Sequence, residues 1–201
     1  MTSAAPAPAL TSRLAETSTP IHPALAERWS PRSFVTTEPI DETVLTAALE
    51  AARWAPSANN SQPARFVVGR RGSAVFDTIA ANLLGFNQVW AGSAAALIVG
   101  IAETSDDQGT PRRFAEYDLG QALAHLTVQA QLDRLHVHQM GGIDAAALSA
   151  AFGLPANQLP LTVTALGTLG TPDALPDEAL RSRETAPRAR RPLDEIVLVR
   201  E

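Results

Sequence analysis

The chain has 201 residues, of which 45% are apolar and 18% charged, and these shares exclude a disordered or membrane-spanning protein. The formal net charge of −5 argues against non-specific nucleic-acid binding, which needs a broadly basic face. There is no Cys, and all 16 basic residues are Arg, so thiolate chemistry and lysine Schiff bases are excluded. If the chain is an enzyme, we therefore expect a bound cofactor to carry the chemistry.

The chain is expected to form one domain with an extended segment at each end. Residues 1–20 are rich in Ala, Pro, Ser and Thr without periodicity, which predicts a loose N-terminal arm before a single domain over 21–201. Within that domain, residues 169–201 have the character of an extended C-terminal arm. The N-terminus lacks a basic start followed by an apolar run, so no secretory signal is expected and a cytoplasmic location is predicted.

Apolar periodicity and turn residues predict the following elements in chain order. They are a helix capped by Asp41 and ended by Pro56, a strand over 65–70, a helix opened by Ser73, a buried strand over 95–101, a long helical stretch over 113–136, a helix capped by Asp144 and ended by Gly153, a strand over 161–167, and a short final strand over 196–199. Helices and strands do not alternate strictly, which favours the α+β class with a mixed central sheet flanked by helices. The last strand follows a long connector, and a partner subunit is one destination for it.

The first motif that suggests chemistry is Arg28-Trp29-Ser30-Pro31-Arg32-Ser33-Phe34. Two guanidinium groups four residues apart, with a hydroxyl between them, can surround a phosphate group. The alternative is a solvated surface turn, which the spacing alone favours.

A second motif, Ala55-Pro56-Ser57-Ala58-Asn59-Asn60-Ser61-Gln62-Pro63, follows the first predicted helix directly. Its amide and hydroxyl side chains, fixed between prolines, could recognise a heteroaromatic ring. The alternative is a simple helix stop and turn. Ser57 has no Gly-x-Ser-x-Gly context, so it is not expected to be a nucleophile.

In this order and spacing, the two motifs resemble the FMN-dependent nitroreductase family. Three later segments, at 85–90, 139–144 and 188–197, extend the resemblance over residues 22–201. The resemblance implies FMN as a tightly bound cofactor and an intertwined homodimer that exchanges its C-terminal strand. It also implies a set of cofactor-binding residues: Arg28, Trp29, Ser30, Arg32, Pro56, Ser57, Ala58, Asn60, Asn87, Met140, Gly141, Gly142, Arg188 and Arg190.

The roles of these residues are likewise implied by the resemblance. Arg28, Ser30, Arg188 and Arg190 would hold the phosphate and ribityl chain, while Arg32 and Asn87 would lie at the pyrimidine edge of the flavin. The backbone at Gly141 and Gly142 would approach the flavin N5, and glycine permits such an approach. The loop with Pro56, Ser57, Ala58 and Asn60 would pack on the flavin of the other subunit.

The activity implied is hydride transfer from NAD(P)H through the flavin to a small electron-poor acceptor, such as a nitroaromatic or a quinone, in a ping-pong reaction. No side chain is expected to act as a catalytic acid or base, and no metal, membrane or nucleic acid is expected as a partner. Two alternatives stay open. One is a flavin-binding carrier or sensor without turnover, and the other is a flavin dehydrogenase or ene-reductase for one dedicated metabolite.

Two further groups of residues stay ambiguous. His136 and His138 could be a metal pair, but a catalytic zinc site needs a third ligand, so a solvated helix end is the preferred interpretation. Phe86 and Trp90 could line a substrate pocket, although core packing explains aromatic side chains equally well.

Overall fold

A computed structural model describes residues 13–201. Residues 1–12, which make up most of the expected N-terminal arm, lie outside the described residues. The helices and strands of the described part are, in chain order, α1 (Pro23–Glu27), α2 (Glu42–Arg53), η2 (Ala58–Asn60), β1 (Ala64–Arg70), α3 (Ala74–Ala81), α4 (Asn87–Trp90), η3 (Ala91–Ser93), β2 (Ala96–Glu103), α5 (Ala115–Leu132), β3 (His136–Met140), α6 (Ala145–Phe152), β4 (Gln158–Gly167), η4 (Pro172–Ala174), α7 (Glu178–Thr185) and α8 (Leu193–Ile196).

The centre of the fold is a four-stranded sheet in the order β1-β2-β4-β3. Its three strand pairs are all antiparallel. The α+β class is therefore as predicted, whereas the parallel pair that a mixed sheet requires does not occur among these four strands. A parallel pair would need a further strand at one of the two sheet edges, β1 or β3.

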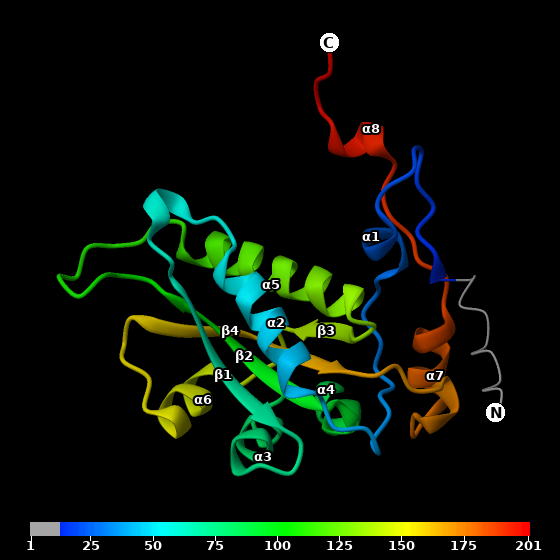
Figure 1. The fold of residues 1–201 in the computed structure, drawn as a ribbon, viewed down its shortest axis with the longest axis horizontal. Coiled ribbons are helices and arrows are strands. Elements are labelled where there is room, and N and C mark those ends of the chain that lie inside the picture. Colours follow the sequence, from blue (N-terminus) through cyan, green and yellow to red (C-terminus); the bar gives the residue numbers. More distant parts are fainter. Residues whose placement is uncertain (1–12) are drawn as a thin grey trace.

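Helices cover both faces of this sheet (Figure 1). Helices α2 and α5 pack on one face, where Leu45 and Leu126 meet Ile98 of β2. On the other face, α3 and α6 pack against Leu97 and Val99 of the same strand. Because side chains alternate along a strand, β2 contributes side chains to the hydrophobic cores on both faces of the sheet, and most of its residues are buried.

The predicted helix caps are confirmed. Asp41 Oδ1 accepts hydrogen bonds from the backbone N–H groups of Thr43 (2.7 Å) and Val44 (3.3 Å) at the start of α2. Ser73 and Asp144 cap α3 and α6 in the same way. Gly153 ends α6 in the left-handed conformation, with φ of 60°. Within residues 13–201, no helix combines the length and the apolar character needed to cross a membrane.

The prediction of a continuous helix to residue 136 is wrong. Helix α5 ends at Leu132, and Arg134 adopts a left-handed backbone conformation with φ of 61°, which turns the chain back toward the sheet. His136 and His138 then lie on strand β3, paired with β4. They are therefore not a solvated helix end, and this strand was missed.

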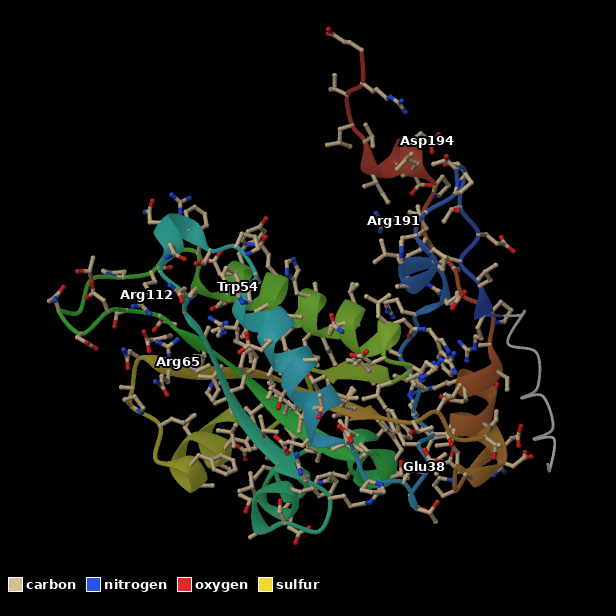
Figure 2. All side chains as sticks on the ribbon, in the orientation of Figure 1. Glu38, Trp54, Arg65, Arg112, Arg191 and Asp194 are labelled. Atoms are coloured by element: carbon tan, nitrogen blue, oxygen red, sulfur yellow. The ribbon has the colours of Figure 1, made fainter. Side chains whose placement is uncertain are left out.

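The strand predicted over 196–199 does not form within the single chain. Leu193–Ile196 is one turn of helix, α8, and the segment after it has no regular structure. Figures 1 and 2 show α8, which carries Asp194, and the segment after it projecting away from the body. Leu198 and Val199 are 88% and 81% exposed. The exchange of this segment with a partner subunit stays a prediction.

Candidate functional site

The loop between α1 and Phe34 carries the first arginine motif, and the C-terminal segment brings further arginines to it. Arg28 is half-buried, and its pKa is lowered by burial and by the positive charges of Arg188 and Arg190. The Arg28 guanidinium donates weakly to Ser30 Oγ (3.5 Å). Its Nε is buried without a hydrogen-bond partner in the described part of the chain. A buried donor without a partner at the centre of three positive charges is a place for an anion.

A buried carboxylate, Glu184 on α7, fixes the shape of this loop. Both of its oxygens accept from the backbone N–H of Arg32 (2.9 and 3.0 Å), and Oε1 also accepts from the N–H of Ser33 (3.1 Å). The Arg32 guanidinium lies 3.9 Å from Glu184 Oε2. Burial raises the pKa of Glu184, while these amide donors and the charges of Arg32 and Arg13 oppose that rise.

His138 on β3 holds the same loop from its other side. Its Nδ1 lies 2.8 Å from the carbonyl oxygen of Pro31. Burial lowers the pKa of His138 to about 4, helped by the charges of Arg32 and Arg28 and opposed by the backbone contacts. The ring is therefore neutral at pH 7, and a carbonyl partner requires that Nδ1 carries the proton and donates it. The ring also contacts Trp90, with centroids 4.6 Å apart.

The N-terminal and C-terminal segments meet beside this loop. Arg188 Nη1 donates to the carbonyl oxygens of Arg13 (2.8 Å) and Ala26 (2.6 Å). The Arg13 guanidinium stacks on the buried ring of Trp29, 3.9 Å from its centroid. Arg190 is exposed, and its Nη1 donates to the neighbouring carbonyl of Ala189 (2.7 Å). Arg188 thus uses one nitrogen to join the two segments, and Arg190 keeps most of its donors free.

A second group of predicted residues converges at the end of β3. Asn87 Nδ2 donates to the carbonyl oxygen of Gly142 (3.2 Å), which also accepts from Leu84 N–H (2.9 Å). A Cβ placed on Gly142 would lie 2.8 Å from Asn87 Nδ2, so a larger residue here would push the Asn87 amide out of this contact. Met140 packs in the core beneath it, while Gly141 is exposed. The structure therefore brings Asn87 and Gly142 together, and their contacts with a flavin stay a prediction.

The loop with Pro56, Ser57, Ala58 and Asn60 does not join these residues within one chain. Figure 1 shows it at the opposite end of α5 from the C-terminal segment. Ala58 N–H donates to Asp118 Oδ2 of α5 (3.0 Å), and Ser57 Oγ accepts from Gln62 N–H (3.0 Å). The loop lines one end of a groove of about 540 Å³ between α2, β1 and α5. Within one chain this loop lies away from the arginine cluster, and its packing on the flavin of a second subunit stays a prediction.

The two aromatic side chains left open by the sequence have different surroundings. Trp90 is buried in the core and stacks on Phe34, with centroids 6.3 Å apart. Phe86 is 55% exposed, and the Arg183 guanidinium carbon lies 5.0 Å from its ring centroid. Trp90 is therefore a core residue, whereas Phe86 lies on the surface directly before Asn87.

No three His, Cys, Asp or Glu residues gather into a metal site anywhere in residues 13–201. Three residues of the site were missed from the sequence: Glu184, His138 and Arg13. Glu184 and Arg13 occur in polar segments that have the pattern of solvated surface, and His138 was assigned to a helix. Only their long-range contacts show their place in the site.

The comparisons with known proteins agree on one family. The family model described as the nitroreductase family matches residues 25–168. A crystal structure described as an oxidoreductase containing FMN is 34% identical, with a TM-score of 0.84 over 90% of this chain and 92% of that chain. A nitroreductase from Desulfovibrio desulfuricans, solved in complex with FMN, is 26% identical, with a TM-score of 0.72 over 92% and 99% of the two chains.

A protein from Mycolicibacterium smegmatis, described as an uncharacterised 15.4 kDa protein, is 39% identical over 140 residues, which cover 66% of this chain and 92% of that protein. The family match spans most of the chain and ends before the C-terminal segment. It includes the arginine loop, Asn87 and Gly142, whose contacts are described above. The chain therefore belongs to the nitroreductase family.

Proposed function

We propose that this protein is an FMN-dependent oxidoreductase that takes hydride from NAD(P)H and passes electrons to a small electron-poor acceptor. The observation that carries the proposal is the buried, unpartnered Nε of Arg28 among the arginines of the C-terminal segment, close to the Arg32 loop. Two of the similar structures are described as containing FMN. They support the choice of cofactor.

The arginine cluster fits the phosphate end of FMN. A phosphate monoester carries about 1.5 to 2 negative charges at neutral pH and offers three strong acceptor oxygens. Arg28 and Arg190 have donors free for these oxygens, and Ser30 adds an exposed hydroxyl. Arg188 would contribute mainly charge and its remaining donors, because Nη1 already bonds two carbonyl groups.

The residues near the end of β3 fit the ring. Arg32, held by Glu184, would place a fixed positive charge at the pyrimidine edge, which favours the reduced, anionic ring. Asn87 would hold the same edge, and the backbone of Gly141 and Gly142 would lie beside N5 because no side chain intervenes. When bound, the flavin supplies the chemistry of hydride acceptance and donation. The chain's own residues bind, orient and tune it.

The proposed site requires two copies of the chain. The loop with Pro56, Ser57, Ala58 and Asn60 is remote from the arginine cluster of its own chain, so a homodimer would bring the two together. The exposed segment with Leu198 and Val199 would then pair with the free edge of β1 in the second copy. The groove beside β1 gives this segment a place to bury its apolar side chains.

The decisive experiment is purification followed by a flavin spectrum and an assay with quinone as acceptor. We expect a yellow protein with about one FMN per chain that, in the absence of oxygen, turns over NADH or NADPH only when the quinone is present to take the electrons. Tight binding of FAD without affinity for FMN would refute the cofactor assignment. Stable FMN binding without oxidation of either nicotinamide would leave a flavin carrier or sensor as the function.

A further inference from the structure

We propose that Arg183, in cation–π contact with Phe86, is a recognition site for a carboxylate or phosphate group on the small molecule that exchanges electrons at the flavin. The inference rests on the proposed function and adds to it a substrate class, namely anionic reactants. The flavin contacts named above do not include either residue. The argument depends on where this pair lies, on the partners of Arg183, and on the balance of charge around it.

The pair lies at the edge of the proposed ring site. Phe86 immediately precedes Asn87, whose amide contacts Gly142. Arg183 immediately precedes Glu184, whose carboxylate holds Arg32. Arg183 is also close enough for its charge to lower the pKa of Arg32. A small molecule bound over the ring would therefore meet Arg183 at its outer end.

Arg183 also keeps its donors free. Its guanidinium makes no ion pair and no side-chain hydrogen bond with residues 13–201, and residues 1–12 contain no acidic side chain that could pair with it. Its neighbour on the same helix, Arg181, is by contrast bonded to Glu178 (3.1 Å) and to the carbonyl of Leu175 (2.8 Å). The guanidinium carbon of Arg183 lies 5.0 Å from the Phe86 ring centroid, and this cation–π contact uses none of the N–H groups, so they stay available for a bidentate oxyanion.

The charge around the site favours an anionic ligand. Six arginines are linked here by mutual charge effects, and within residues 13–201 Glu184 is the one carboxylate in ion-pair contact with any of them; the six are Arg13, Arg28, Arg32, Arg183, Arg188 and Arg190. The phosphate of FMN would offset about two of these charges. A positive surplus is left on the Arg183 side, in a chain whose net charge is −5. Such a local field raises the concentration and affinity of anions.

Two matched acceptors test the proposal: 4-nitrobenzoate, which carries the anion, and 4-nitrobenzamide, which is neutral and of similar size. The ratio of their kcat/KM values is measured for the wild-type holoprotein and for Arg183→Ala, Arg183→Lys and the control Arg113→Ala. Arg113 is the control because its guanidinium carbon makes the same kind of contact, 5.4 Å from the ring centroid of exposed Phe114, and it lies just before α5, at the opposite end of that helix from the C-terminal segment of its own chain. NADPH and NADH are compared in the same variants, since the 2′-phosphate is a second source of the same chemistry.

We expect Arg183→Ala to lower the benzoate-to-benzamide ratio about tenfold, the effect of losing one charge-assisted hydrogen bond, and Arg183→Lys to lower it less. A tenfold fall confined to the NADPH-to-NADH ratio would support the anion site and assign it to the reductant. Unchanged ratios, or equal falls in Arg183→Ala and Arg113→Ala, would overturn the proposal. Benzoate and benzamide dissociation constants, measured from the flavin absorbance, make the same comparison without turnover. An inactive holoprotein would therefore refute the proposed reaction and still decide the role of Arg183.

Discussion

The contacts of Glu184 predict that a residue outside the arginine motifs controls both the fold of the Arg28–Phe34 loop and FMN binding. Two substitutions separate the effect of the hydrogen bonds that the Glu184 side chain accepts from the effect of its negative charge. In Glu184→Gln, Oε1 can still accept from the N–H groups of Arg32 and Ser33, which now lie 2.9 and 3.1 Å from it. The ion pair with Arg32 is lost. In Glu184→Ala, both the acceptors and the charge are removed.

The magnitudes follow from the number of donors left without a partner. Glu184→Ala leaves the buried N–H of Ser33 and the N–H of Arg32 unpaired, and each such group costs about 1–3 kcal/mol. We expect the free energy of unfolding of the apoprotein to fall by about 2–5 kcal/mol. Glu184→Gln should cost about 1 kcal/mol, because one neutral acceptor replaces a charged one at the same amide groups.

Chemical denaturation of the apoproteins at one fixed protein concentration measures these losses, since a dimer's stability depends on concentration. FMN titration and the flavin midpoint potential provide a second readout that a purely structural residue would not change. If Arg32 lies at the pyrimidine edge, removing the nearby negative charge in Glu184→Gln should shift the potential to more positive values. An unchanged potential, together with a loss of stability in Glu184→Ala below about 0.5 kcal/mol, would refute this reasoning.

Three further predictions concern other parts of the molecule. The pKa of His138 is about 4 in the folded state against 6.5 in the unfolded chain, so its contribution to stability is complete above pH 6.5 and is lost as the pH falls toward 4. The unfolding free energy of wild type relative to His138→Gln should therefore fall by about 3 kcal/mol between pH 6.5 and 4, whereas a constant difference would contradict the burial of a neutral ring. Arg190→Ala should weaken FMN binding by roughly ten- to a hundredfold in a fluorescence titration of the apoprotein, with Arg113→Ala unchanged; equal effects would mean that Arg190 is an ordinary surface charge. Deleting residues 186–201 should lower the mass measured by light scattering from that of a dimer toward that of a monomer, and it should also weaken FMN binding. A truncated protein that stays dimeric with full FMN affinity would exclude strand exchange.

Local signals in the sequence were sufficient for most of the fold. Asp41, Ser73 and Asp144 were recognised as helix caps because a cap is formed by a side chain and amide groups two or three residues away. The apolar run that became β2 was recognised because a strand buried on both faces needs no alternation. These features depend on neighbours in sequence, so they can be predicted without knowing the tertiary structure.

Two strands show where such signals fail. The apolar pattern of α5 continues to residue 136, and the turn that ends the helix has Arg134 in the left-handed conformation instead of the glycine that would signal it in the sequence. Over 196–199 a β-prone run forms no strand within the single chain, because the segment projects away from the free edges β1 and β3 of its own sheet. Propensity gives a segment its preference, and only an available edge turns that preference into a strand.

The arginine motif shows why the candidate site could be only half predicted. The residue types in Arg28-Trp29-Ser30-Pro31-Arg32 indicate phosphate chemistry, yet their spacing alone fits a solvated turn. In the structure the backbone of this loop is bonded to Glu184, 152 residues from Arg32, and to His138, 107 residues from Pro31. These buried partners fix the backbone conformation of the loop, from which the side chains of Arg28 and Arg32 extend. A preformed frame lowers the entropy lost when a ligand binds, so the affinity of the loop for an anion depends on residues that its own sequence does not contain.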